Sequence, residues 1–360
     1  MKNITTPRVF IAATRQNDGK TTTSLGLIAA LQKEFPRIGY IKPVGQRFVE
    51  IEEQKIDEDT VLMDSVYGLN CPLVDMSPIA VEPDFTRKYL QAANNEALVK
   101  KIQNAFDRVA WEKDFVLCEG SGHAGVGAVF DLSNAQVAKH LGCKVIIVSR
   151  GGIGKPIDEV ALNQALFEKE GVEIIGVIIN KVLEDKVDYI SDFARRGLKR
   201  KGLDLLGVIP HQAILSQPTM DLIREELKAE VLNSPATLHT AVEDVIVGAM
   251  AAQNALKFFK RGVLLITPGD REDILTAALT HGGEMAGIVL TGGLQPTNGA
   301  LQAVQTMRIP VLLAKDDNYQ VTSTVHDLTV KTRPTDAEKI SLIRDLVAKN
   351  VNVKKILDSL

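Results

Sequence analysis

The sequence predicts an α/β protein with a parallel sheet flanked by helices, followed by a second, smaller α/β domain. Short runs made almost entirely of Val and Ile alternate with segments of helical spacing, which is typical of parallel strands covered on both faces. This alternation breaks at the turn-rich stretch 233–237 and then begins again. Because 360 residues are enough for two domains of ordinary size, we expect a first domain over 1–232 and a second over 238–350.

The composition excludes several classes of protein. A net charge of −3 gives no general surface for nucleic acid or anionic membranes. The three cysteines have no C-x-x-C spacing, so they indicate neither a disulfide framework nor a zinc site. The N-terminus lacks the apolar core of a signal peptide, and no stretch approaches the roughly 20 apolar residues that cross a bilayer. We therefore expect a soluble cytoplasmic protein with no nucleic-acid or membrane partner.

The start of the chain has the order of a phosphate-binding loop (P-loop). An apolar run over 9–13 reads as a buried strand, a polar turn ends in Gly19-Lys20-Thr21, and 22–33 has helical spacing. Backbone N–H groups at such a turn and helix start face an anion. In this motif Lys20 would reach the β- and γ-phosphates, and the Thr21 hydroxyl would bind Mg²⁺. The motif usually begins with Gly, and here that position is Thr14.

A second strand is expected over 38–45. It places Lys42 at a strand's carboxyl end, the side on which α/β sheets bind ligands, although a solvated lysine is the alternative. The charged segment 50–60 reads as a loop that leads into a helix. Asp57 or Asp59 could cap that helix, or could bind Mg²⁺, which favours carboxylates together with phosphate oxygens and water.

A third strand opens onto an acidic residue and two glycines in the stretch 114–122. Glu119 follows the hydrophobic run directly. In P-loop proteins an acid at the end of such a strand orients Mg²⁺ or its water shell, and we favour that role over an incidental turn residue. A helix with apolar residues at regular spacing precedes the strand, over 95–111.

Three more strands complete the expected six of the first domain, over 144–149, 173–180 and 204–210. Helices are expected between and after them, over 157–169, 189–201 and 221–231. In the second domain the strands are expected over 242–247, 262–267, 287–293 and 309–314, with helices between them and a helical tail over 337–347.

The ends of these elements together resemble one family, dethiobiotin synthetase. Related ATP-dependent amide-forming enzymes, such as cobyrinic acid a,c-diamide synthase, share much of the pattern, which covers roughly residues 7–232. The matching stretches, in order and spacing, are Ala13 to Thr21, Lys42 to Val44, Asp59, Glu119 to Gly122, Asn180, and Gly207 to Pro210. The family also lacks the usual first glycine of the loop, so Thr14 agrees with it.

The resemblance implies that MgATP is the cofactor. Its implied ATP contacts are Thr14, Asn17, Asp18, Gly19, Lys20, Thr21, Thr22, Asn180 at the adenine edge, and Pro210. The implied Mg²⁺ ligands are Thr21, Asp59 and Glu119. Lys20 and Lys42 would act in catalysis, because the family uses the lysine of Lys-Pro-Val to bind the acceptor carbamate.

The sequence departs from the family in the half that binds the acceptor. The serine that follows Lys-Pro-Val in the synthetase is replaced by Gly45-Gln46-Arg47, and the glycine loop reads Glu119-Gly-Ser-Gly-His123. His123 is either a new substrate contact or an ordinary loop residue. We therefore expect ATP binding, and do not expect dethiobiotin as the product.

The second domain resembles the DRTGG domain through Asp270-Arg271 and Thr291-Gly-Gly293. Both stretches follow strands, so they could converge at one sheet edge. The structural alternative is Asp270 as a helix cap and the two glycines as a tight turn. This domain accompanies synthetase-like domains at the front of long phosphate acetyltransferases. Because the chain stops at Leu360, we expect that front half alone, without an acetyltransferase domain.

Two functions follow from these expectations. The first is an enzyme in which MgATP phosphorylates a small carboxylate or carbamate held by Lys42, before an amine attacks. The second is a nucleotide-sensing regulator of a metabolic enzyme, with little or no turnover. A partitioning-type ATPase is less favoured, because its loop usually carries an early lysine and here Arg15 is the only other basic residue in the loop. A homodimer is expected, since the related synthetases build acceptor sites across a dimer interface.

Overall fold

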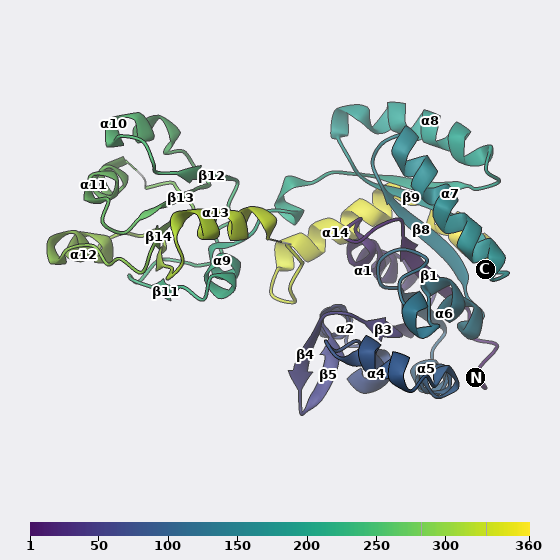
Figure 1. The fold of residues 1–360 in the computed structure, drawn as a ribbon. Coiled ribbons are helices and arrows are strands. Elements are labelled where there is room, and N and C mark those ends of the chain that lie inside the picture. Colours follow the sequence, from purple (N-terminus) through teal and green to yellow (C-terminus); the bar gives the residue numbers. More distant parts are fainter. Residues whose placement is uncertain (282, 329) are drawn as a thin grey trace. The chain divides into compact units, whose positions relative to one another are not determined.

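The chain folds as two compact units. The structure, a computed structural model, describes residues 1–281, 283–328 and 330–360 (Figure 1). The first unit comprises Met1–Gln212 and Thr332–Leu360, and the second comprises Ala213–Lys331. The second unit is therefore inserted within the sequence of the first. These bounds differ from the expected division at 233–237.

A six-stranded parallel sheet forms the first unit, in the order β10-β9-β8-β1-β7-β2. The strands are β1 (Arg8–Ala13), β2 (Ile38–Ile41), β7 (Phe115–Glu119), β8 (Lys144–Arg150), β9 (Ile174–Val182) and β10 (Leu205–Pro210). The central strands are buried along almost their whole length, which explains their unbroken Val and Ile runs. The predicted fold class is confirmed.

Helices flank this sheet and connect its strands. They are α1 (Lys20–Leu31), α5 (Asn95–Val109), α6 (Asn134–Leu141), α7 (Gly154–Lys169), α8 (Val187–Lys199), α14 (Ala337–Asn350) and α15 (Val353–Asp358). Short 3₁₀ helices occur at Ala128–Phe130, Glu184–Lys186, Ala213–Leu215 and Leu256–Phe258. The stretch expected as one strand over 38–45 is two strands, because Pro43 has no N–H to donate between them.

Small elements fill the connection from β2 to β7. They are β3 (Val44–Gly45), β4 (Phe48–Ile51), β5 (Gln54–Asp57), β6 (Ile79–Ala80), α2 (Glu58–Tyr67), α3 (Leu73–Met76) and α4 (Phe85–Gln91). The prediction of a loop over 50–60 is wrong. β4 and β5 form an antiparallel hairpin there, and α2 follows. Glu52 and Glu53 turn the hairpin with positive φ. No residue of β4 is buried, and β5 is buried only at Ile56 and Asp57, so the sequence shows no apolar alternation there.

The second unit has its own five-stranded sheet, in the order β11-β15-β14-β13-β12. The strands are β11 (Glu230–Val231), β12 (Asp244–Val247), β13 (Val263–Pro268), β14 (Gly287–Thr291) and β15 (Val311–Leu313). Its helices are α9 (Met220–Glu226), α10 (Ala252–Ala255), α11 (Glu272–His281), α12 (Asn298–Gln305) and α13 (Asn318–Asp327). Leu264 and Leu265, neighbours on β13, enter separate core clusters, as expected for a sheet covered on both faces.

The expected linker lies inside the second unit because its residues pair with β15. The backbone of β11 pairs antiparallel with β15. The Asn233 side chain donates to the carbonyls of Met307 and Ile309 and accepts from the N–H of Val311. These contacts tie the stretch to the second sheet, so the boundary falls earlier, near Gln212.

The helical tail expected over 337–347 is α14, which returns to the first unit. It crosses α1 so closely that a Cβ at Gly26 would lie 2.3 Å from Cγ2 of Val347. After α14 the chain pairs with the outer edge of β10. Asn352 N–H donates to the Leu206 carbonyl at 2.8 Å, and Gly207 and Val351 form an antiparallel bridge. The end of the chain thus covers part of an edge strand.

Candidate nucleotide-binding site

The loop between β1 and α1 is held by a buried carboxylate. Asp18 accepts hydrogen bonds from Thr14 Oγ1 at 2.7 Å and from Arg15 N–H at 2.9 Å. Thr14 Oγ1 also lies 3.1 Å from Ser149 Oγ, on the neighbouring strand β8. Thr14 therefore anchors the loop through its hydroxyl, which is a role that glycine could not fill.

The loop leaves the N-terminus of α1 open to an anion. Gly19 is the N-cap residue, with φ +100°, and provides no side-chain cap. The first turn of α1, from Lys20 onward, contains no acidic residue. The first N–H groups of a helix have no partner within the helix, and they carry the positive end of its dipole. The geometry is that of a phosphate cradle.

Asn180, at the carboxyl end of β9, fastens the loop from outside. Its Nδ2 donates to the Asp18 carbonyl at 2.9 Å, and its Oδ1 accepts from the Lys181 N–H at 2.9 Å. Lys181 Nζ in turn donates to the Asn17 carbonyl at 2.8 Å. Sequence reasoning did not select Lys181, although a lysine directly after a candidate site residue was a usable signal. The adenine contact expected of Asn180 stays a prediction.

Glu119 joins the loop to the next strand ends. Its Oε1 accepts from Thr21 Oγ1 at 3.0 Å, and its Oε2 accepts from the Tyr40 hydroxyl at 3.2 Å. Tyr40 was not predicted as a site residue, because an aromatic residue within a strand usually belongs to the core. Burial raises the pKa of Glu119, and the charge of Lys42 opposes that rise.

Lys42 is buried between two carboxylates. Its ammonium forms an ion pair with Asp57 Oδ1 at 3.0 Å and a hydrogen-bonded ion pair with Asp59. Burial alone would lower the pKa of Lys42, but the charges of Asp59, Asp57 and Glu119 outweigh it and raise that pKa above its ordinary value. The alternative of a solvated lysine does not hold. Asp57 also caps α2, accepting from the Asp59 N–H at 2.9 Å.

The pKa of Lys20, the first residue of α1, is shifted in the opposite direction to that of Lys42. Burial lowers its pKa, and the charge of Lys42 lowers it further, while Glu119 raises it. In the described residues no side-chain hydrogen bond or ion pair of Lys20 is present. A triphosphate beside Lys20 would supply the negative charge that this ammonium lacks.

The remaining predicted residues are less closely joined to the loop. Thr22 lies half-buried in the first turn of α1, and Pro210 ends β10, which is separated from β1 by β9 and β8. His123 is exposed, and its Nδ1 accepts from the Gly125 N–H within its own loop at 3.2 Å. This local contact is typical of an ordinary loop residue, which was one of the two roles considered for His123.

Side chains suited to Mg²⁺ converge beside the loop. Thr21 and Glu119 are in hydrogen-bond contact, and the charge of Asp59 acts on Glu119. In phosphate sites Mg²⁺ usually takes one or two hydroxyl or carboxylate oxygens from the protein. Its other ligands are phosphate oxygens and water. Within the described ranges, no group of three or more His, Cys, Asp or Glu side chains is arranged to hold a metal alone.

The DRTGG-like residues of the second unit hold its own backbone. Arg271 donates to the carbonyls of Gly248 and Met250 and pairs with Asp273. Gly292 and Gly293 both have positive φ, and their N–H groups donate to the carbonyls of Asp316 and Ala314. Pro268 and Thr291 are register partners on adjacent strands, so the two stretches do meet at one edge. The two glycines form the tight turn of the structural alternative, and the cap role of Asp270 stays a prediction.

A search of the described residues finds no helix with the length and hydropathy to cross a membrane.

This parallel sheet, with an anion cradle between its first strand and first helix, defines the class of P-loop nucleotide-binding proteins. The chain belongs to the AAA domain family, whose model matches residues 7–219. The DRTGG domain model matches residues 222–328. The resemblance expected from the sequence, a synthetase-like P-loop domain followed by a DRTGG domain, is confirmed.

Relatives of two kinds match the chain. Phosphate acetyltransferase of Nitratidesulfovibrio vulgaris is 27% identical over 363 residues, which cover 97% of this chain and 51% of that protein. The ATP-dependent dethiobiotin synthetase BioD of Methanococcus vannielii is 27% identical over 206 residues, covering 56% of this chain and 92% of that protein. The chain thus spans about half the length of the acetyltransferases it matches.

Among solved structures, a septum site-determining protein MinD from Pyrococcus horikoshii, in complex with Mg-ADP, covers 58% of this chain and 83% of its own, with 17% identity and a TM-score of 0.38.

Proposed function

We propose that this chain binds MgATP at the loop between β1 and α1 and acts as a nucleotide-sensing regulatory module related to the front half of phosphate acetyltransferases. The observation that carries the regulatory part is the ion pairing of Lys42 with Asp57 and Asp59. In a synthetase-like reaction this lysine would hold the acceptor. Here its charge is already compensated by two buried carboxylates.

The triphosphate would bind at the start of α1. The open N–H groups of the first turn and the ammonium of Lys20 face the same region, and a phosphate anion would restore the charge balance that burial disturbs at Lys20. Thr21, Glu119 and Asp59 would hold Mg²⁺, which supplies positive charge against the phosphate oxygens.

Nucleotide sensing would follow from the position of Asp59. This carboxylate pairs with Lys42, and it is also an expected Mg²⁺ ligand. Binding of MgATP would draw Asp59 from Lys42 towards the metal, so that the segment from β5 to α2 changes its contacts. Because a ligand shifts an equilibrium only by its differential affinity, this exchange of partners is the means by which ATP would favour one state.

A second candidate function is ATP-dependent phosphorylation of a small carboxylate or carbamate. It is favoured by the nearness of Lys42 to Lys20 and Glu119, because the charge of Lys42 acts on the pKa of Lys20 and the charge of Glu119 acts on both lysines. If Asp59 moved to the metal, Lys42 could hold an acceptor beside the γ-phosphate, and catalysis would come from positioning and charge neutralisation.

Titration calorimetry of the full chain with ATP, with and without Mg²⁺, tests the nucleotide site. We expect binding that Lys20→Ala abolishes and that Lys33→Ala leaves unchanged, since Lys33 is an exposed residue just beyond α1. Equal ATP affinity in Lys20→Ala and in the unmodified chain would refute the proposed site.

ATP hydrolysis separates the two functions. Stimulation by a small carboxylate or amine alone would identify an enzyme. Stimulation or a change of nucleotide affinity only in the presence of a phosphate acetyltransferase would identify a regulator.

We also propose that the chain forms a homodimer, as the resemblance to the synthetases implies. Light scattering at working concentration should give twice the mass of the 39.2 kDa chain, and a monomer mass would contradict it.

A further inference from the structure

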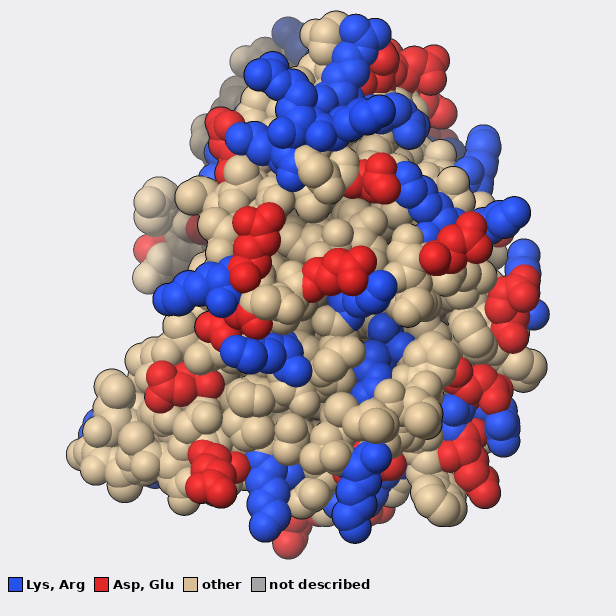
Figure 2. Space-filling view, turned by 90° about the vertical axis from the view of Figure 1, so that its right-hand side faces the viewer, with Lys and Arg blue, Asp and Glu red and all other residues tan. Residues whose placement is uncertain are grey.

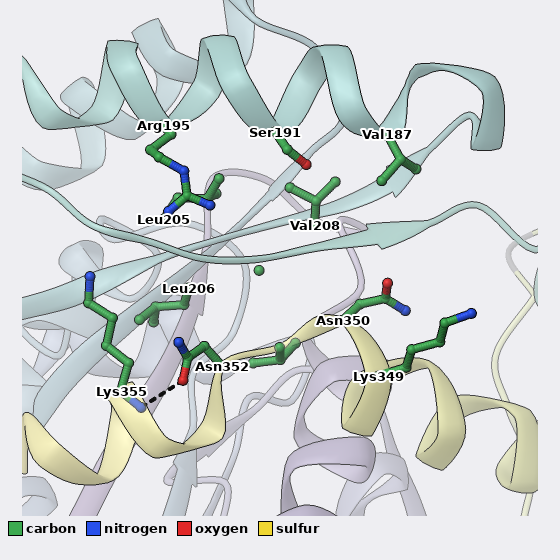
Figure 3. A pocket seen from close by; sticks show the side chains of 12 residues that line it. Val187, Ser191, Arg195, Leu205, Leu206, Val208, Lys349, Asn350, Asn352 and Lys355 are labelled. Carbon is green, nitrogen blue, oxygen red and sulfur yellow. Dashed lines mark hydrogen bonds between the residues drawn. The ribbon is translucent and has the colours of Figure 1, made fainter.

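A pocket of about 450 Å³ lies at the outer edge of the first sheet, away from the nucleotide loop. Its walls come from α8, from the edge strand β10 and from the turn between α14 and α15 (Figure 3). In sheet order β10 is separated from β1 by β9 and β8, so this pocket is distinct from the site beside Lys20. The wall from α14 and α15 lies outside the residues that the two family models match, 7–219 and 222–328.

The lining residues combine an apolar floor with a cationic rim. The floor is the edge of β10, with Leu205 and Val208 on the side of α8 and Leu206 on the opposite side (Figure 3). Figure 3 shows Arg195 and Ser191 pointing from α8 towards β10, while Lys355 and Asn350 approach from the opposite wall. The apolar residues of β10 can contact a carbon skeleton, while the polar groups above and below them can bind its charged ends.

The charge of the lining is all of one sign. Arg195, Lys349 and Lys355 line the pocket, and no Asp or Glu is among the lining residues. Lys355 pairs with Asp204 at 2.9 Å, outside the lining set. Arg195 and Lys349 have no ion-pair partner in the part of the chain that the structure describes. Basic side chains also gather at the top of the face shown in Figure 2, where α8 lies, with acidic side chains beside them. The unpaired cations of the lining itself attract anions.

Close backbone contacts fix the segment after α14 against β10. Gly207 lies against the chain after α14, where a Cβ would be 2.4 Å from the Asn350 carbonyl oxygen. Asn352 caps the next turn, accepting from the Lys355 N–H at 2.9 Å, the contact dashed in Figure 3. Lys349 and Lys355 are therefore carried on a segment fixed to β10, which holds one wall of the pocket in place.

We propose that this pocket is a second ligand site, which binds a small organic anion with at least two negative charges and a short carbon skeleton. One charged end would form a bidentate contact with the Arg195 guanidinium, and the other would lie near the Lys355 ammonium, which rises on the same side of the pocket in Figure 3. The carbon skeleton would rest on the edge of β10, against Leu205 and Val208. A carboxylate and a phosphate ester share this chemistry, so either could supply the charged groups.

The test is calorimetry of the full chain with a graded set of probes. Succinate and 2-phosphoglycolate carry two charged ends on a carbon skeleton, inorganic phosphate carries charge alone, and succinamide carries the skeleton alone. We expect the first two to bind, and the latter two to bind at least tenfold more weakly. Preference for succinate over 2-phosphoglycolate, or the reverse, identifies the charged group. Failure of both organic anions to bind at millimolar concentration would overturn the proposal.

Variants assign the binding to this pocket. Arg195→Ala and Lys355→Ala should each weaken binding roughly tenfold or more, because each removes a charge-assisted contact. Arg196→Ala is the matched control: the next residue on α8 pairs with Asp192 and does not line the pocket. Lys20→Ala should bind the probe normally, which separates this site from the phosphate loop. Loss of binding in Lys20→Ala, or equal affinity in Arg195→Ala and Arg196→Ala, would overturn the assignment.

Discussion

A Cβ atom placed on Gly19 would lie 2.0 Å from Nδ2 of Asn180. The same Nδ2 donates to the Asp18 carbonyl, so Asn180 fills the space beside the loop and fixes its backbone at once. Gly19 adopts φ +100°, a conformation that side chains rarely tolerate. The backbone of Gly19 thus depends on Asn180, which lies 161 positions further along the sequence.

Gly19→Ala should therefore abolish ATP binding, because the added methyl group displaces Asn180 and the loop together. Gly68→Ala is the control, since Gly68 also has positive φ, +56°, but has no atom within 4 Å of an added Cβ. It should lose about 1 kcal/mol of stability and keep full nucleotide affinity. Calorimetry and thermal unfolding measure the two effects, and ATP binding by Gly19→Ala at normal affinity would contradict this account of the loop.

Glu119→Gln should reduce the contribution of Mg²⁺ to ATP affinity at least tenfold, while affinity without metal stays within about twofold. The amide keeps the shape and an acceptor for Thr21, but removes the charge that would face the metal. Calorimetry with and without Mg²⁺ measures the difference. Asp75→Asn is the control, because Asp75 is a buried carboxylate that pairs with Arg108. This variant should leave the metal dependence of ATP affinity unchanged. An unaltered metal effect in Glu119→Gln would remove Glu119 from the site.

Lys42→Met should destabilise the first unit by about 3–5 kcal/mol near neutral pH, because two buried carboxylates lose their shared counter-charge. Burial already raises the pKa of Asp57, and loss of the ammonium raises it further. A carboxyl group whose pKa is higher in the folded state stabilises the fold as it takes up its proton. The variant should therefore regain stability as the pH is lowered from 8 to 5.

Urea unfolding across that pH range measures the effect. Lys55→Met is the matched control, because Lys55 pairs with Glu82 at the surface, and surface pairs contribute about 1 kcal/mol or less. Its urea midpoint should stay close to that of the unmodified chain. A Lys42→Met variant whose deficit does not depend on pH would show that the carboxylates are not held together as observed.

Gly26→Ala should cost about 1–3 kcal/mol, although alanine is normally the better helix former. The added methyl group would meet Val347 Cγ2 at 2.3 Å and the Ile343 carbonyl oxygen at 3.0 Å, so α14 must move off α1. Gly154→Ala, at the start of α7 with open space around it, should be neutral or stabilising. Thermal unfolding compares the two, and a Gly26→Ala variant as stable as Gly154→Ala would refute the close crossing.

The strands that carry the site could be predicted because a strand buried on both faces has an unmistakable composition. The runs that end at Glu119 and Asn180 are continuous and apolar, so their polar final residues stood out. The hairpin of β4 and β5 could not be found this way, because β4 has no buried residue and β5 is buried only at Ile56 and Asp57. Tyr40 was missed for the converse reason, since its ring is buried like a core residue and only its hydroxyl reaches Glu119.

The return of α14 to the first unit was also outside the reach of local patterns. Its amphipathic spacing predicts a helix but does not say which surface the apolar face covers. Gly26, inside the apolar second half of α1, was a signal of a close crossing, and its partner Val347 lies more than 300 residues further along the chain.

The insertion of the second unit into the sequence of the first has a consequence for synthesis. A nascent chain completes α1 and β10 early, but the segment that covers both is made only after residues 213–331 have been synthesised. During that interval the apolar face of α1 at Gly26 and the outer edge of β10 stay uncovered, and unpaired strand edges invite association with other chains. Rapid folding of the inserted unit would shorten this interval, so mutations that slow it should lower the yield of correctly folded first unit without touching any of its residues.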